Sequence, residues 1–393
     1  MNKLSVYFSN FNNKRDNNIW VFTEWYGKRC GDNSTFFANY IVNHFPNIKV
    51  YWICEKQADT SLLQSGVIIL EKDSNESIDI LRKAAVVIMI QGIDEFTTGG
   101  YNYCGNALKV NLWHGVMWKK LGYDMASESG FWKKTKGRIK TGFNRHYLFE
   151  SPSDLYTDVF KRAFLIKPNE IVNAGQPRNS IFYDAKMIKN ARIGILEQLK
   201  TISDADINSE TSIITYMPTF RDGLEEAFDF ANYSESTNLN DYLKNTNAVL
   251  VQKAHFVRSE TKKDNNSFSN IITNNNLIAQ LLLAATDLLI TDYSSCFFDY
   301  LLLDRPIIHY IYDYDFYRDK NRGLYYDYKD VVCGDAIFNE RDMLTCIREN
   351  LQNPSKESEL RKSRRKIYQQ YESADSCRII AEEIFRRTGV TGK

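Results

Sequence analysis

Residues 276–311 read NLIAQLLLAATDLLITDYSSCFFDYLLLDRPIIHYI, and this stretch decides the fold. Apolar residues at helical spacing predict a helix at Asn276–Ala284, and an apolar run between polar residues predicts a buried strand at Asp287–Thr291. A second helix at Ser295–Leu303 and a second strand at Pro306–Ile311 follow the same pattern. Buried strands that alternate with helices are typical of a doubly wound parallel sheet.

The same alternation extends outward along the chain in two series. Further strands are predicted at Ile19–Phe22, Val50–Cys54, Gly66–Leu70, Ala85–Gln91, Lys109–Trp113, Thr211–Tyr216 and Ala248–Lys253. Further helices are predicted at Ser34–His44, Ile78–Ala84 and Pro354–Arg387. The polar, helix-prone segment Lys186–Asn208 separates the two series.

We therefore expect an α/β protein with two doubly wound parallel-sheet domains that face a central cleft. The N-terminal domain is predicted over residues 1–190 and the C-terminal domain over 209–353, with helices at 354–393 packing back on both. A length of 393 residues suits two domains of ~150–200 residues each. Ligands of such folds bind at the carboxyl ends of the strands.

Composition excludes several classes of protein. With a net charge of +1, 43% hydrophobic and 25% charged residues, the chain is globular and is not a polycation that coats nucleic acid. No apolar run reaches the ~18–20 residues of a membrane span, and the polar N-terminus does not resemble a signal peptide. The seven scattered cysteines contain no C-x-x-C pair, so we expect free thiols in a reducing cytoplasm.

Two strand ends carry residues suited to phosphate. In Thr291-Asp-Tyr-Ser-Ser295, Ser294 and Ser295 occupy N-cap positions, and the first-turn amides up to Phe298 could bind an anion. A well-capped helix without a ligand is the alternative. In Tyr216-Met-Pro-Thr-Phe-Arg-Asp222, Thr219 and Arg221 offer a hydroxyl and a guanidinium, although a surface turn with an Arg–Asp pair would look the same.

Two histidines follow strands and are candidates for catalysis. His255 follows Lys253, and together they could neutralise a diphosphate and protonate a leaving phosphate. His114, in Trp113-His-Gly115, could act as a base, and Gly115 permits close approach of the backbone to a ligand. A histidine after a strand is also often a surface residue. His309 lies inside a predicted strand and is expected in the core, and Asp313-Tyr-Asp315 is interpreted as a loop without metal.

The stretch from Trp113 to Tyr147 is basic and aromatic. Its charges are eight positive and two negative: Lys119, Lys120, Lys133, Lys134, Lys136, Arg138, Lys140 and Arg145 against Asp124 and Glu128. Trp118, Phe131, Trp132 and Phe143 lie among them. Such a face suits an anionic membrane surface or a polyanionic acceptor, and a solvated helix face is the alternative. Nucleic acid is not expected, because no reader motif accompanies the patch.

An ordered set of motifs spans residues 18 to 350. It comprises Gly31-Asp-Asn33, Trp113-His-Gly115 with Lys119-Lys-Leu-Gly122, Gly175-Gln-Pro-Arg-Asn179, Pro218-Thr-Phe-Arg-Asp222, Lys253-Ala-His255, Ile290-Thr-Asp-Tyr-Ser-Ser295 with Asp299, and Arg322-Gly323 before Tyr325-Tyr-Asp-Tyr328. The set resembles the CDP-glycerol glycerophosphotransferase family of teichoic-acid and capsule-polymer enzymes. Val116, Phe256 and Cys333 depart from its pattern, which leaves the acceptor open.

The resemblance implies a GT-B arrangement and transfer of glycerol phosphate from CDP-glycerol to a hydroxyl of a lipid-linked or saccharide acceptor, with release of CMP. No cofactor is expected beyond the CDP-glycerol donor, no metal site is predicted, and metal dependence is left open. His114 would deprotonate the acceptor, and His255 would stabilise the pyrophosphate and the leaving CMP. The donor would be bound by Thr219, Arg221, Lys253, Asp292, Ser294, Ser295 and Arg322.

The basic stretch then becomes an acceptor-side or membrane patch, and the protein a cytoplasmic enzyme bound peripherally to the inner face of the membrane. The residues of this patch are Gly115, Lys119, Lys120, Lys133, Lys134 and Arg138. The length favours a primase-like or compact capsule enzyme. A GT-B glycosyltransferase that uses a nucleotide sugar and a non-catalytic membrane adaptor are the alternatives, and the polyol is left open.

Overall fold

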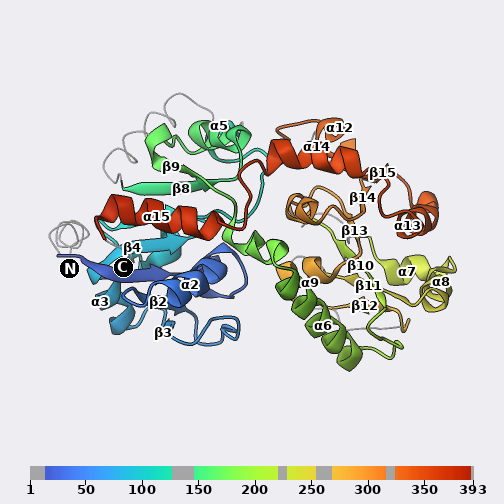
Figure 1. The fold of residues 1–393 in the computed structure, drawn as a ribbon, viewed down its shortest axis with the longest axis horizontal. Coiled ribbons are helices and arrows are strands. Elements are labelled where there is room, and N and C mark those ends of the chain that lie inside the picture. Colours follow the sequence, from blue (N-terminus) through green and yellow to red (C-terminus); the bar gives the residue numbers. More distant parts are fainter. Residues whose placement is uncertain (1–13, 126–145, 220–227, 254–267, 316–323, 391–393) are drawn as a thin grey trace. The chain divides into compact units, whose positions relative to one another are not determined.

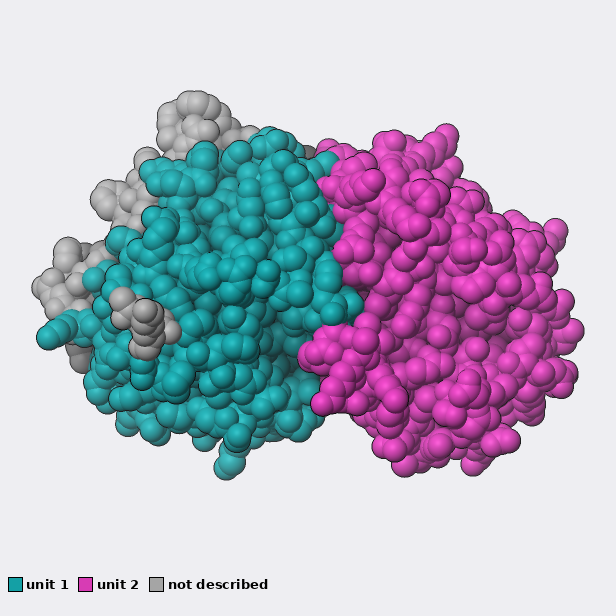
Figure 2. Space-filling view, in the orientation of Figure 1, with its two compact units in different colours: residues 1–115, 121–183, 369–393 teal, residues 116–120, 184–368 magenta. Residues whose placement is uncertain are grey.

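A computed structural model describes residues 14–125, 146–219, 228–253, 268–315 and 324–390. The chain divides into two compact units, coloured teal and magenta in Figure 2. Unit 1 comprises residues 1–115, 121–183 and 369–393, and unit 2 comprises residues 116–120 and 184–368. The main boundary follows Tyr183 rather than residue 190, and the C-terminal segment is divided between the units after Tyr368.

The sheet of unit 1 is parallel, and among the described residues it has seven strands in the order β3-β2-β1-β4-β7-β8-β9. A two-stranded antiparallel hairpin, β5 with β6, lies outside it. The bounds are β1 Asp16–Phe22, β2 Lys49–Cys54, β3 Ile68–Glu71, β4 Ala84–Met89, β5 Thr97–Thr98, β6 Tyr101–Asn102, β7 Leu108–Asn111, β8 Tyr147–Ser151 and β9 Ile171–Asn173.

Helices cover both faces of this sheet (Figure 1). Along β1, Trp20 and Phe22 face a core shared with α2 and α15, whereas Ile19 and Val21 face a core shared with α3. The alternation follows from the period of two in a strand. The helices are α2 Asn33–His44, α3 Asn75–Lys83, α5 Asp154–Ala163 and α15 Ser376–Thr388, with 3-10 turns η1 Trp25–Gly27, η2 Ile93–Phe96, η3 Gly122–Asp124, η4 Pro168–Glu170 and η5 Pro177–Tyr183.

The sheet of unit 2 is also parallel, and its described strands follow the order β12-β11-β10-β13-β14-β15. Its strands are β10 Ser212–Met217, β11 Ala248–Gln252, β12 Ile271–Thr273, β13 Leu288–Thr291, β14 Ile307–Tyr310 and β15 Asp335–Ile337. Ile213 faces a core shared with α6 and α9, and its neighbour Ile214 faces a core shared with α7, α8 and α13.

The helices of unit 2 include the two that were predicted on either side of Asp287–Thr291. The bounds are α6 Ala185–Ile202, α7 Phe230–Glu235, α8 Leu239–Asn245, α9 Ala279–Ala285, α10 Cys296–Tyr300, α12 Tyr328–Val331, α13 Met343–Gln352 and α14 Ser358–Tyr368, with 3-10 turns η7 Leu301–Leu303 and η8 Glu340–Asp342. Within the described ranges, no helix is both long and apolar enough to cross a membrane.

Both sheets reverse their strand order at one place. The reversal lies between β1 and β4 in unit 1 and between β10 and β13 in unit 2. In open α/β sheets, ligands bind outside the carboxyl ends of the strands at such a switch point. The doubly wound α/β architecture predicted from sequence is therefore confirmed, and each unit has one place where the fold favours a ligand.

Candidate functional site

His114 lies near the switch point of unit 1, three residues after the end of β7. The backbone turns sharply before it, because Trp113 has a φ of 51°. The turn is stabilised by the Trp113 N–H, which donates to Oδ1 of Asn111 at 2.8 Å. Gly115 has a φ of 138°, in the region that favours glycine. This backbone conformation alone accounts for a glycine at the position, without a ligand.

The His114 ring is fixed by a hydrogen bond to the end of β4. Its Nδ1 lies 2.9 Å from the carbonyl oxygen of Ile90. A carbonyl can only accept, so Nδ1 carries the proton and Nε2 is the basic nitrogen of the neutral ring. The rings of Trp25 and Trp113 flank the imidazole, with centroids 5.4 and 4.4 Å away. This is the tautomer and orientation that a general base requires.

Burial is the main effect that keeps this imidazole neutral. Burial lowers the pKa of His114; the hydrogen bond to the Ile90 carbonyl and the carboxylate of Asp32 oppose that effect, and the guanidinium groups of Arg178 and Arg29 reinforce it. His114 is half-buried. At neutral pH the ring is therefore ready to accept a proton.

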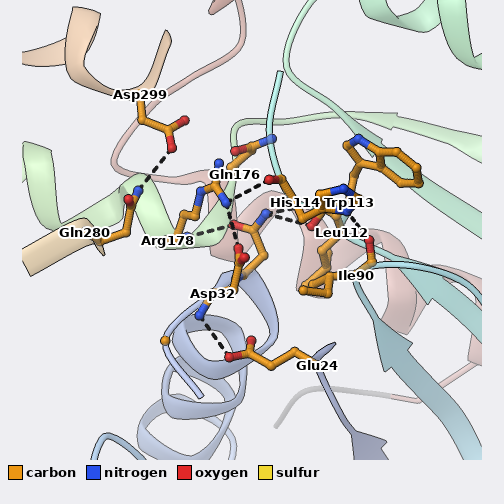
Figure 3. Close-up of polar contacts among 12 residues, drawn as sticks. Glu24, Asp32, Ile90, Leu112, Trp113, His114, Gln176, Arg178, Gln280 and Asp299 are labelled. Carbon is orange, nitrogen blue, oxygen red and sulfur yellow. Dashed lines mark hydrogen bonds and ion pairs between the residues drawn. The ribbon is translucent and has the colours of Figure 1, made fainter. Parts of the chain in front are cut away.

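A buried polar network lies beside His114 (Figure 3). Arg178 forms a 2.7 Å ion pair with Asp32 through Nη1, which also donates to the carbonyl of His114 at 3.1 Å. Glu24, fully buried after β1, accepts from the Asp32 N–H at 2.9 Å and from the Thr35 N–H and hydroxyl at 3.1 and 2.9 Å. Burial, followed by the charge of Asp32, raises the pKa of Glu24 to about 8.

Sequence reasoning gave no role to Glu24 or Arg178. A signal for Glu24 was available, because it is the first ionisable residue after the apolar strand Ile19–Phe22. Arg178 stood in the quoted motif Gly175–Asn179, but its partner Asp32 is 146 residues away in sequence.

The switch point of unit 2 is closed by Asp292. Its Oδ1 accepts from the Thr219 N–H at 2.8 Å, after β10, and from the Ser294 N–H at 3.2 Å, after β13. Thr291 adds a second tie, since its hydroxyl donates to the Met217 carbonyl at 2.7 Å. Asp292 is 1% exposed, and its Oδ1 connects the loops that follow β10 and β13.

The capping expected at Ser294 and Ser295 differs in the structure. Ser295 is the N-cap of α10, but its backbone is already helical and its side chain makes no capping hydrogen bond. The N–H of Phe298 donates to the Ser295 carbonyl at 3.2 Å, so this amide is not available to a phosphate. The predicted set of four first-turn amides is therefore wrong at Phe298.

Lys253 directly follows β11, the strand that pairs with β10. Its backbone N–H donates to the Tyr216 carbonyl at 2.9 Å, and its Nζ donates to the Asn275 carbonyl at 2.6 Å. The side chain is buried, at 8% exposure. The other predicted donor residues, Arg221, His255 and Arg322, lie outside the described residues.

Residues 116–120 follow His114 in sequence but belong to unit 2. Trp118 is 2% exposed and donates through Nε1 to the Tyr326 carbonyl at 2.8 Å. Its ring lies 5.6 Å from Tyr293 and 6.1 Å from Phe297, beside the Thr291–Ser295 loop. Trp118 is thus a core residue and not part of an exposed basic and aromatic face, which corrects that part of the prediction.

Of the remaining residues of the predicted patch, the structure describes the two lysines next to Trp118. Lys119 is half-buried and forms an antiparallel bridge with Leu324 of unit 2, and Lys120 is half-buried beside it. Lys133, Lys134 and Arg138 lie outside the described residues.

His309 is fully buried in β14, as predicted for a core residue. Burial lowers its pKa to about 4, and the Cys333 N–H donates to its Nε2 at 3.3 Å. Among the residues that the structure describes, no group of three His, Cys, Asp or Glu side chains could hold a metal ion.

Comparison with known proteins identifies relatives along nearly the whole chain. The family model described as CDP-Glycerol:Poly(glycerophosphate) glycerophosphotransferase matches residues 5–386. A teichoic acid poly(glycerol phosphate) polymerase of Bacillus spizizenii is 31% identical over 71% of this chain and 70% of its own length. A teichoic acid glycerol-phosphate transferase of Staphylococcus aureus is 26% identical over 94% of this chain and 93% of its own.

The fold has a solved counterpart. The wall teichoic acid polymerase TagF matches 97% of this chain with a TM-score of 0.76 and 21% identity, and 92% of that chain is covered. This likeness confirms the GT-B-like fold class, while the expected central cleft stays a prediction. By its family match and its relatives, the chain belongs to the CDP-glycerol:poly(glycerophosphate) glycerophosphotransferase family.

Proposed function

We propose that this enzyme transfers glycerol phosphate from CDP-glycerol to a hydroxyl of a teichoic-acid or capsule-polymer acceptor. One observation carries the proposal: His114, near the switch point of unit 1, has Nδ1 fixed to the Ile90 carbonyl and Nε2 left as the base. Family membership supplies the donor class.

The reaction is an attack of the acceptor oxygen on the phosphorus that carries glycerol. The new bond joins that oxygen to phosphorus, and the bond between this phosphorus and the bridging oxygen of CMP breaks. The acceptor proton passes to Nε2 of His114, and CMP leaves with the bridging oxygen. Because little covalent chemistry is left to the protein, alignment and charge stabilisation are its main contributions.

The donor phosphates are assigned to unit 2. Thr219, Lys253, Ser294 and Ser295 come from the ends of β10, β11 and β13, where a doubly wound sheet binds ligands. Asp292 is assigned to holding two of these loops. Arg221, His255 and Arg322 complete the proposed donor site, with His255 stabilising the leaving CMP. No metal or other cofactor is proposed.

The acceptor and the location rest on sequence. Lys133, Lys134 and Arg138, with Lys119, Lys120 and Gly115, are proposed to face an anionic acceptor at the inner face of the cytoplasmic membrane. Charge reversal at Lys133, Lys134 and Lys136 should weaken binding to vesicles that contain anionic lipid. Unchanged binding would return this surface to an ordinary solvated face.

The donor is tested by incubating the enzyme and a lipid-linked glycerol-phosphate acceptor with CDP-glycerol, CDP-ribitol or UDP-sugars. CMP release from CDP-glycerol supports the proposal. CMP release from CDP-ribitol alone would identify ribitol as the polyol of the donor, and UDP release would indicate a glycosyltransferase. Absence of any nucleotide release, together with vesicle binding, would indicate a membrane adaptor.

His114→Gln should lower turnover by about 10²–10⁴-fold, the usual contribution of a general base. His44→Gln is the matched control, since His44 is exposed and its Nδ1 also bonds a carbonyl, that of Tyr40 at 2.8 Å. Equal turnover of the two variants would remove His114 from the mechanism.

A further inference from the structure

The ion pair between Asp32 and Arg178 is the most enclosed charged pair near His114. Both residues are 7% exposed, and the charged atoms are 2.7 Å apart. Asp32 is the N-cap of α2, and Arg178 belongs to η5. Asp32 also accepts from the Asn33 N–H at 2.8 Å and from Trp25 Nε1 at 3.0 Å. The carboxylate is thus well compensated, and its position is fixed from three sides.

The same arginine holds the backbone that carries His114 (Figure 3). Its Nη1 donates to the His114 carbonyl at 3.1 Å, and its own N–H donates to Oδ1 of Asn33 at 3.1 Å. Asn33 in turn donates through Nδ2 to the carbonyls of Leu112 and Trp113 at 3.1 and 3.0 Å. Three consecutive carbonyls are therefore bound. The Arg178 side chain binds that of His114, and Asn33, which the Arg178 backbone N–H orients, binds those of Leu112 and Trp113.

These hydrogen bonds hold a strained part of the backbone. Trp113 adopts a φ of 51°, a conformation that bulky side chains rarely adopt and that persists only where the surroundings impose it. If these carbonyls were released, the turn would relax and the ring of His114 would move relative to Ile90. Because Nδ1 must stay within hydrogen-bond distance of that carbonyl to keep Nε2 basic, a small shift affects the base directly.

Resting on the proposed function, we infer that Arg178 is a positioning residue for His114 and that Asp32 is the counter-ion that holds Arg178 in place. Neither residue is assigned to the donor or to proton transfer. Their contribution is to hold the catalytic imidazole in one tautomer and one place.

The far side of the Arg178 loop is anchored as well. Glu372 accepts through Oε1 from the Gln176 N–H and from Nδ2 of Asn179, both at 2.9 Å. A Cβ on Gly175 would lie 2.7 Å from the Glu372 Cα, so glycine is required for this approach. The loop that presents Arg178 is therefore fixed on both sides.

The test compares Arg178→Lys and Asp32→Asn with Arg361→Lys. Arg361 is the matched control, because it is 1% exposed and pairs with Asp304 at 3.0 Å in unit 2. We expect kcat to fall about 10²-fold in the first two variants, the usual effect of a displacement of about 1 Å, with the Kd for CDP-glycerol unchanged. Arg361→Lys should lower the melting temperature and leave kcat unchanged.

A second readout does not depend on activity. In protein labelled with 15N-histidine, the His114 signals, assigned with His114→Gln, should report a protonated Nδ1 in the wild type. They should shift toward a mixture of tautomers in Arg178→Lys. The near-isosteric Asp32→Asn variant keeps the test decisive if the arginine variant fails to fold.

Unchanged kcat and unchanged tautomer signals in Asp32→Asn and in any folded Arg178→Lys would overturn the inference. So would a raised Kd for CDP-glycerol with unchanged kcat, which would make Arg178 a donor ligand. Absence of CMP release by the wild type would instead refute the proposed function, and the tautomer signals would still decide the role of Arg178.

Discussion

The effect of Glu24→Gln on the free energy of unfolding should change sign with pH. The variant should be less stable than the wild type in acid and more stable in alkali. Glu24 is fully buried, and burial followed by the charge of Asp32 raises its pKa from 4.5 to about 8. The folded state thus binds the Glu24 proton more tightly than the unfolded state. Stability from this group is complete below about pH 4.5 and is lost as pH rises through about 8.

The magnitude follows from the size of that interval. At 1.36 kcal/mol for each pH unit, the interval between 4.5 and about 8 corresponds to at most about 5 kcal/mol. Glutamine cannot ionise, so the variant lacks this pH dependence. At pH 5 we expect it to be about 1 kcal/mol less stable than the wild type, since the amide nitrogen that replaces Oε2 cannot accept from the Thr35 N–H.

The assay is denaturant unfolding of wild type and Glu24→Gln at pH 5 and pH 9, followed by tryptophan fluorescence. The difference between the two proteins is compared at the two pH values, so that groups common to both cancel. The variant should gain several kcal/mol relative to the wild type between pH 5 and pH 9. An unchanged difference would refute the reasoning, because it would mean that Glu24 is ionised across this range.

Three further predictions concern the candidate site. Burial lowers the pKa of His114, although the hydrogen bond to Ile90 and the charge of Asp32 oppose this effect. The acid limb of the pH profile of kcat/KM should therefore lie below pH 6.5, and a limb above that value would contradict a neutral, buried base. Trp118→Ala should destabilise unit 2 by about 3–5 kcal/mol in thermal unfolding, whereas a change within 0.5 kcal/mol, about that of a surface substitution, would place Trp118 on an exposed face. Asp292→Ala removes the acceptor of the Thr219 and Ser294 amides and should cost about 1–3 kcal/mol for each; a donor KM that rises without loss of stability would make Asp292 a ligand of the donor instead.

Apart from β8, which was not predicted, the strands of four or more residues were predictable because they are apolar runs bounded by polar residues. Ile19–Phe22 and Asp287–Thr291 fall within or beside β1 and β13. Strands of three residues, such as β9, β12 and β15, were missed, since three residues carry no period that separates a strand from a loop. All three are at sheet edges, where partners far apart in sequence define the strand.

For the site, sequence located the loops but not the contacts within them. His114 and the Thr291–Ser295 turn were singled out because polar residues follow apolar strands at these positions. Asp292 was singled out as a donor residue, but its hydrogen bonds to two backbone amides were not predicted, because only the folded sheet brings those amides together. Trp118 was expected on the surface because its neighbours are lysines, and no local pattern shows that residues 116–120 pack with unit 2.

Because the chain passes between the two units more than once, neither unit can be expressed as one continuous segment. No single cut separates one complete unit from the other, because unit 1 needs residues 369–393 and unit 2 needs residues 116–120. A fragment ending at Tyr183 would lack α15, which supplies Ile380 and Ile384 to its core. A fragment starting at Asp184 would lack Trp118. Expressing either unit alone therefore requires a chain with its segments reconnected, and recombination could exchange unit 2 between relatives only by replacing both of its segments together.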